Sequence, residues 1–296
     1  MLNIRSRITN FTPPPRSVVA GRIPGYTIHH SSKKERLFRR CAYREVVLTV
    51  GLDLAAEAGN TALARLEWHR DGCSVRGIQQ ACEDEMIVDA LLTADKAGID
   101  CPLGWPVPFV EFVAAHRSGN VAVPVGTRGR DWRRNLALRL TDRVVHERTG
   151  LTPLSVSADR IGHAAMRCAA LLSRLAREGR PVDRCGTGVV VEVYPAASLR
   201  LWGLPYRGYK RAHDVAALGR LVDGLLAAAP WLDLGACESL CRRSHDATDA
   251  VVAALTARAA ALDRTTSPEP GEVETARSEG WIALPAGPLD DLRTGV

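Results

Sequence analysis

The chain has 296 residues, of which 46% are hydrophobic and 24% are charged, as in ordinary globular proteins of one large or two small domains. Its apolar runs fall short of the roughly 18 residues of a membrane-spanning helix, and it shows no secretory signal with an apolar core. We therefore expect a cytoplasmic protein with no membrane partner.

The net charge of +6 is unevenly distributed. Residues 1–45 carry ten Lys or Arg against two Glu, or +8, which leaves 29 basic and 31 acidic residues, or −2, for the remainder. This segment also contains Pro13-Pro14-Pro15, so we expect a basic, disordered extension that either binds nucleic acid or is a passive tail. Residues 46–296 are expected to form a single domain with a C-terminal tail. Their near-neutral charge argues against a protein that coats long nucleic acid.

Three antiparallel strands are expected to open the domain. Residues 46–56 alternate, with leucines and Val50 on one face and Asp53 on the other. Two further strands, 60–69 and 74–82, are joined by the turn Arg70-Asp71-Gly72. The pattern predicts an antiparallel meander.

Helices and single strands alternate after the meander, which predicts an α/β fold with a mixed five-stranded sheet and helices on both faces. Residues 102–130 are rich in Gly and Pro and are expected to make a long excursion over a cleft. Ser157 is a candidate N-cap. We expect helices over 83–93, 132–148, 157–178, 213–229 and 244–262, strands over 97–101, 188–194 and 281–284, and irregular structure over 199–210.

Carboxylates stand where three of these strands end, at Asp53, Asp100 and Glu192, and Asp246 and Asp249 open the last long helix. Acidic residues are poor strand formers and are costly to bury unless they are paired or bind a metal. Acidic ligands without a Cys or His cluster suit a hard ion, so we expect Mg²⁺ or Mn²⁺. The sequence predicts that these five residues form one catalytic metal site near the strand ends.

Each carboxylate also has an ordinary structural alternative. Asp53 and Asp100 could begin turns, and Glu192 could face solvent from an edge strand. Asp246 and Asp249 lie three residues apart on one helix face, where acids favour the helix N-terminus without any metal.

Several basic residues are further candidates. Lys210 follows Arg207 and Tyr209 and could approach an acidic substrate or lie in a solvated loop. Arg139 and Asp142 are spaced for an ion pair on one helix, and His245 could assist proton transfer or be an exposed histidine. Four arginines within seven residues could contact phosphate: Arg128, Arg130, Arg133 and Arg134.

An ordered set of short motifs resembles an uncharacterised bacterial and archaeal family, usually described as predicted nucleases of RNase H fold (domain of unknown function 429). The resemblance runs from about Val47 to Pro285. The motifs are Gly51-Leu52-Asp53-Leu54-Ala55, Ile99-Asp100-Cys101-Pro102-Leu103-Gly104, Arg139-Leu140-Thr141-Asp142, Glu192-Val193-Tyr194-Pro195-Ala196, His245-Asp246-Ala247-Thr248-Asp249-Ala250 and Glu279-Gly280-Trp281-Ile282.

The resemblance implies an RNase H-like fold with acids on the first strand, the fourth strand and the final helix, which Asp53, Asp100, Asp246 and Asp249 match. Glu192 fits only the family's own motif, and the last helix is also similar to that of Holliday-junction resolvases. We therefore expect a nuclease that hydrolyses RNA or DNA by a two-metal mechanism, on a short or structured substrate. The alternatives are a nucleotide-binding phosphotransferase like actin-like ATPases and sugar kinases, or a non-catalytic nucleic-acid-binding or scaffold protein.

Overall fold

The computed structural model describes residues 46–126, 128–180, 182–210 and 215–294. The predicted basic extension over residues 1–45 lies outside these ranges, so its disorder and the predicted domain division stay predictions. Within the described ranges, no helix combines the length and the apolar character that crossing a membrane requires.

The fold is built on a mixed sheet of six strands in the order β5-β4-β1-β2-β3-β6. The predicted meander is confirmed, because β1 pairs antiparallel with β2 and β2 with β3. The expected number of five strands is wrong, since a two-residue strand, β6, adds to the edge of β3. The strands are β1 Val47–Asp53, β2 Ala62–His69, β3 Gly72–Gln80, β4 Lys96–Asp100, β5 Val190–Glu192 and β6 Leu232–Asp233.

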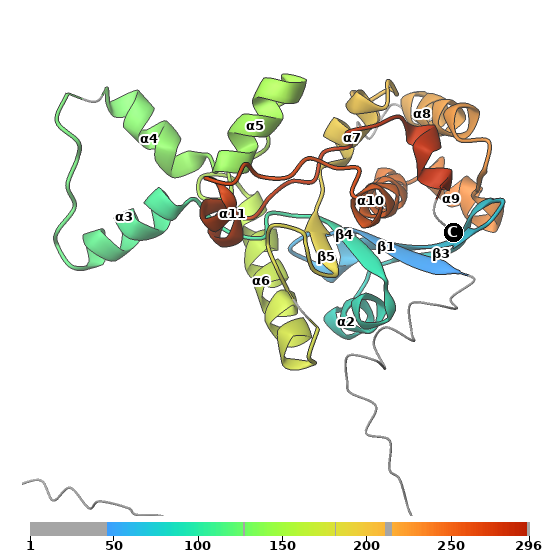
Figure 1. Cartoon of the computed structure of the whole chain (residues 1–296), viewed down its shortest axis with the longest axis horizontal. Helices are drawn as coiled ribbons and strands as arrows, with labels where there is room; N and C mark the ends of the chain where they lie inside the picture. Colours follow the sequence, from blue (N-terminus) through green and yellow to red (C-terminus); the bar gives the residue numbers. More distant parts are fainter. Residues whose placement is uncertain (1–45, 127, 181, 211–214, 295–296) are drawn as a thin grey trace, which may run out of the picture. The chain divides into compact units, whose positions relative to one another are not determined.

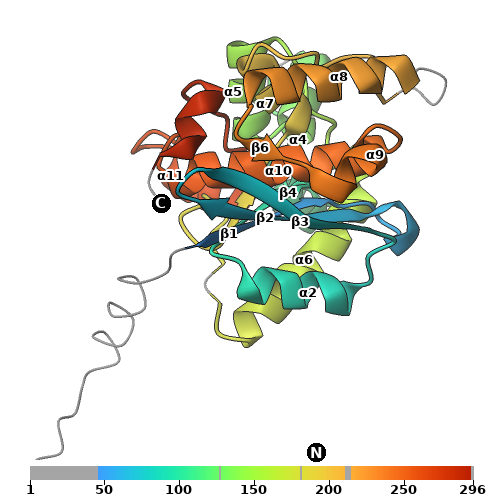
Figure 2. The same ribbon diagram turned by 90° about the vertical axis from the view of Figure 1, so that its right-hand side faces the viewer.

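Helices cover both faces of the sheet, as expected: α10 lies on one face, and α2 and α6 lie on the other (Figure 2). The helices are α2 Asp84–Thr93, α3 Val107–Arg117, α4 Gly129–Ala137, α5 Leu140–Thr149, α6 Ile161–Arg177, α7 Pro195–Leu201, α8 Val215–Ala228, α9 Glu238–Cys241, α10 His245–Ala261 and α11 Val273–Glu279, with short 3₁₀ turns η1 Ala58–Asn60, η2 Gly235–Cys237 and η3 Leu289–Arg293.

Two glycines allow α10 (His245–Ala261) to lie directly on the sheet. A Cβ atom at Gly51 of β1 would overlap the backbone of α10 at Ala250 and Ala254. A Cβ atom at Gly98 of β4 would overlap the carbonyl oxygen of Ala253. Because real Cβ atoms essentially never approach other atoms this closely, the glycines set the short distance between helix and sheet. The same packing places the N-terminus of α10 beside the ends of β1 and β4.

The region between β4 and α6 differs most from expectation. The predicted excursion over 102–130 contains α3, and α3 packs on α4, with the rings of Phe112 and Trp132 5.6 Å apart. Both helices lie to one side of the sheet (Figure 1). The predicted helix 132–148 is divided into α4 and α5 at Leu138 and Arg139, which have extended backbones.

Three further local predictions differ from the structure, the first because a tertiary hydrogen bond takes precedence over the local pattern. Ser157 is not an N-cap: its hydroxyl donates to the carbonyl of Leu136, and α6 begins later, at Ile161. The apolar segment 281–284 makes only an isolated bridge between Ile282 and Glu192 instead of a strand. The segment 199–210, expected to be irregular, begins inside α7 (Pro195–Leu201).

Candidate functional site

The carboxyl ends of β1 and β4 bring two predicted residues side by side. The two strands are parallel, and Asp53 and Asp100 are register partners. Both residues line a cavity of about 630 Å³, together with Glu192 and Lys210. This size falls within the range of small-molecule sites. Three of the five predicted acids therefore line one cavity, and the register of β1 and β4 accounts for two of them, Asp53 and Asp100.

The N-terminus of α10 adds a group of possible metal ligands to this edge of the sheet. Ligand atoms of Asp53, His245 and Asp246 all lie within 4.8 Å of one another. His245 Nδ1 lies 2.8 Å from Asp246 Oδ1, and Ser244 caps the helix by accepting a hydrogen bond from the amide of Ala247. His245 is the residue that sequence reasoning undervalued. Its only local indication was its position directly before Asp246.

Burial and mutual repulsion keep the strand-end acids from ionising easily. Burial, followed by the charges of Asp100 and Asp249, raises the pKa of Asp53 well above its usual value. Burial raises the pKa of Asp100 to about 7, with Asp249 and Glu192 contributing and Lys210 opposing. Such shifts are typical of sites that need a nearby cation or that transfer protons.

Asp249 faces the same acids but is already engaged by two side chains. Its Oδ1 accepts a hydrogen bond of 2.8 Å from the hydroxyl of Tyr209, and its Oδ2 lies 2.6 Å from Nζ of Lys210. The carboxylate is fully buried, whereas the Lys210 side chain is 49% exposed. The structure thus places Asp249 close to Asp53 and Asp100, with the Lys210 ammonium as its ion-pair partner.

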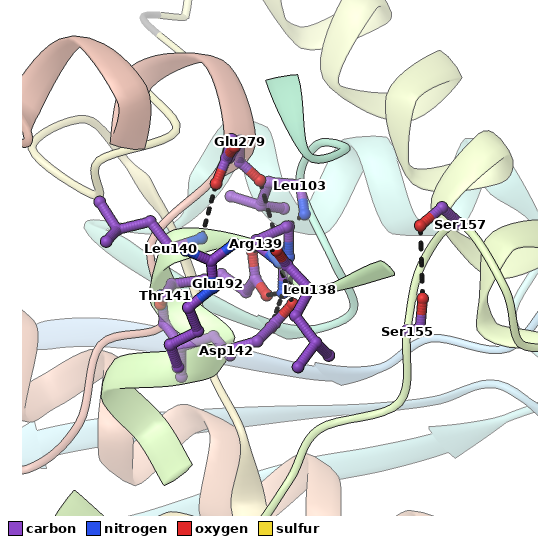
Figure 3. A network of polar contacts seen from close by, with 12 residues as sticks. Leu103, Leu138, Arg139, Leu140, Thr141, Asp142, Ser155, Ser157, Glu192 and Glu279 are labelled. Atoms are coloured by element: carbon purple, nitrogen blue, oxygen red, sulfur yellow. Dashed lines mark hydrogen bonds and ion pairs between the residues drawn. The ribbon is translucent and has the colours of Figure 1, made fainter. Parts of the chain in front are cut away.

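Glu192 belongs to a buried network with Arg139 and Asp142 (Figure 3). Arg139 donates to both oxygens of Glu192, at 2.7 and 2.8 Å, and to both oxygens of Asp142, at 2.9 and 3.2 Å. The amide of Leu103 also donates to Glu192. The expected ion pair of Arg139 with Asp142 is confirmed, but the two residues do not share a helix, because Arg139 is the extended N-cap residue of α5 and Asp142 lies in its first turn. These contacts speak against Glu192 as a metal ligand, because its charge is neutralised and both its oxygens accept hydrogen bonds.

The four predicted phosphate-contacting arginines lie elsewhere. They occur at the start of α4 and within it, are all exposed, and do not line the cavity. Their exposure leaves them available to a ligand that extends beyond the cavity. The residues are Arg128, Arg130, Arg133 and Arg134.

The donor set fits a divalent ion. Two carboxylates and one imidazole converge at Asp53, Asp246 and His245, and among the described residues no hydrogen bond or ion pair occupies the carboxylates of Asp53 and Asp100. Carboxylate and imidazole ligands together suit Mn²⁺ better than Mg²⁺, which prefers oxygen alone.

Comparison with known proteins gives one finding about ancestry. No curated protein and no solved structure matches the chain. One family model, described as "Protein of unknown function (DUF429)", matches residues 51–274, a span that includes every acidic residue of the cavity. Because the match covers well over half of its 296 residues, the chain belongs to this family.

Proposed function

We propose that the protein is a divalent-metal-dependent enzyme that hydrolyses phosphodiester bonds in RNA or DNA. The observation that carries the proposal is the convergence of Asp53, His245 and Asp246, because Asp53 also lines, together with Asp100, the wall of one cavity. An RNase H-like arrangement is part of the proposal. It is supported by the meander and by the parallel strands β4 and β5 beside it, with β6 as an additional edge strand.

Each residue then has a distinct task. Asp53, Asp246 and His245 would hold the ion, which supplies Lewis acidity to a phosphoryl group and acidifies a water molecule. Asp100, with a pKa of about 7, would accept the proton of the attacking water, because a base with a pKa near the operating pH transfers protons efficiently. Lys210 and Arg207, which also line the cavity, would attract the phosphate.

The cavity favours a substrate that inserts one nucleotide unit or one chain end. A volume of about 630 Å³ accommodates a small ligand, and the domain without its first 45 residues carries a formal charge of −2. A long duplex would need an extended basic surface, for which the arginines of α4 are the candidates.

The same cavity keeps a nucleotide phosphotransferase as the second candidate. Its volume suits a free nucleotide. Stabilisation by ATP but not by oligonucleotides in a thermal-shift assay would favour this alternative. The segment that follows β1 has only Gly59 for a phosphate-binding turn, which makes the nuclease our preferred reading.

The direct test is incubation of the full-length protein with labelled RNA, DNA and branched DNA, with Mn²⁺ or with a chelator. We expect metal-dependent cleavage by the wild type, loss in Asp53→Asn, and full activity in Asp71→Asn, an exposed acid in the turn between β2 and β3. If no substrate is cleaved in a metal-dependent manner, the nuclease proposal is refuted.

A further inference from the structure

Lys210 contacts the acidic cluster in a way that a solvated surface lysine does not. Its Nζ lies 2.6 Å from Asp249 Oδ2, and the Asp249 carboxylate is fully buried. The other oxygen, Oδ1, accepts the hydrogen bond of Tyr209. Asp249 Oδ2 has no hydrogen bond from any described residue, so within the described ranges the Lys210 ammonium is the cation that balances its charge.

The Lys210 charge acts on the whole cluster. Burial alone would lower the pKa of Lys210, but Asp249, followed by Asp100 and also Asp53, raises it. The lysine is therefore charged at neutral pH. It opposes the raised pKa of both Asp53 and Asp100, which places one positive charge among three carboxylates.

The charges also limit how many metal ions the site can accept. When all four acids are ionised, Asp53, Asp100, Asp246 and Asp249 have a formal charge of −4, which is the most negative charge they can carry, and the Lys210 ammonium leaves −3. One divalent ion reduces this to −1. A second divalent ion beside an undisplaced lysine would give +1 and would have to bind close to an ammonium group, which is unfavourable in a partly buried site.

We propose that Lys210 takes the place of a second cation, so that the site binds one divalent ion through Asp53, His245 and Asp246. The Lys210 ammonium then supplies the second positive charge for the phosphate. This inference rests on the proposed function but narrows it, because it replaces the expected two-metal arrangement with one ion and one lysine. Asp249 becomes the residue that positions Lys210.

Metal stoichiometry tests the inference without any measurement of activity. Mn²⁺ is titrated calorimetrically into the full-length protein, and electron paramagnetic resonance distinguishes a single ion from a spin-coupled pair. We expect one ion per chain in the wild type and two in Lys210→Met, which keeps the side-chain length but removes the charge. Lys210→Arg and Arg207→Met are the matched controls, since one retains the charge and the other removes a neighbouring exposed charge; both should bind one ion.

The outcomes separate this inference from the proposed function. Two ions in the wild type, or one in both the wild type and Lys210→Met, overturn the role of Lys210 while the metal site stands. Absence of Mn²⁺ binding in the wild type overturns the proposed function and this inference with it. If Lys210→Met does not fold, Lys210→Gln replaces it, and a wild-type stoichiometry of two is still decisive.

Discussion

Replacing Arg139 with methionine tests whether charge holds the network that Arg139 forms with Glu192 and Asp142 in the cavity wall. The Arg139 side chain is 1% exposed, and its partners Asp142 and Glu192 are 0% and 2% exposed. Removing the guanidinium leaves two buried carboxylates without a counter-charge. Breaking a buried ion pair in this way costs about 3–5 kcal/mol, and we expect Arg139→Met to lose that much free energy of unfolding.

The loss should depend on pH, and its sign follows from the carboxylates. Burial raises the pKa of Glu192, and Arg139 is the largest influence that lowers it. In Arg139→Met the folded-state pKa therefore rises further above the unfolded value. The folded variant then binds protons that the unfolded chain releases, so its stability falls as the pH rises above about 4. The deficit relative to the wild type should be larger at pH 8 than at pH 5.

Urea unfolding followed by circular dichroism at both pH values measures this effect. Arg148→Met, at an exposed position of α5, the helix that Arg139 caps, is the matched control and should cost about 0.5 kcal/mol or less. Adding Glu192→Gln to Arg139→Met should recover part of the loss at pH 8. A deficit below about 1 kcal/mol, or one that is equal at pH 5 and pH 8, would refute the assignment of a charge-held network.

Three further outcomes are expected. Gly51→Ala should destabilise the protein by about 3 kcal/mol or more in urea unfolding, because its Cβ would overlap the backbone of α10. The control Gly77→Ala, in open space on β3, should have a much smaller effect. Equal losses of stability in the two variants would contradict the packing argument. The apparent affinity for Mn²⁺ should increase from pH 6 to pH 8 as Asp100, with its pKa of about 7, loses its proton, and calorimetry on Asp100→Asn should show a weaker pH dependence. Replacing Arg130 and Arg133 with alanine should reduce the salt dependence of nucleic-acid binding by about two phosphate contacts, and an unchanged slope in fluorescence anisotropy would exclude α4 from the interface.

Local patterns were sufficient for the part of the site that lies on strands. Asp53 interrupts an alternating apolar strand, and Asp100 ends another, so the sequence predicted both positions, and the parallel register brings them together. The ion pair of Arg139 with Asp142 followed from a spacing of three residues. The strand predictions required only periodicity, whereas the ion pair forms as part of a capping box at the start of α5 and not on the helix face that the spacing suggested.

Contacts between distant segments were beyond the reach of local patterns. The pairing of Tyr209 with Asp249 spans 40 residues, and that of Arg139 with Glu192 spans 53. His245 becomes a candidate metal ligand only because α10 packs on Gly51, which brings the start of the helix close to Asp53. The break between α4 and α5 also depends on a distant contact. Arg139 has an extended backbone there, and its side chain donates hydrogen bonds to the buried Glu192. The periodicity of one segment cannot predict such contacts, because they depend on which distant segments pack together.

Two of the five predicted acids, Glu192 and Asp249, form ion pairs with basic residues of the protein. The two bases, Arg139 and Lys210, differ in burial and in the number of contacts, and this difference indicates different roles. Arg139 is fully buried and holds Glu192 through two parallel hydrogen bonds, a planar arrangement that lysine cannot reproduce and that resists exchange. Lys210 is half exposed and holds Asp249 through one contact, and it also lines the cavity, so its compact ammonium can face a phosphate there while it stays beside Asp249. Glu192 and Arg139 therefore form a fixed part of the cavity wall. In the function that we propose, Lys210 meets the substrate together with Asp53, Asp100, His245 and Asp246, and the buried Asp249 positions Lys210.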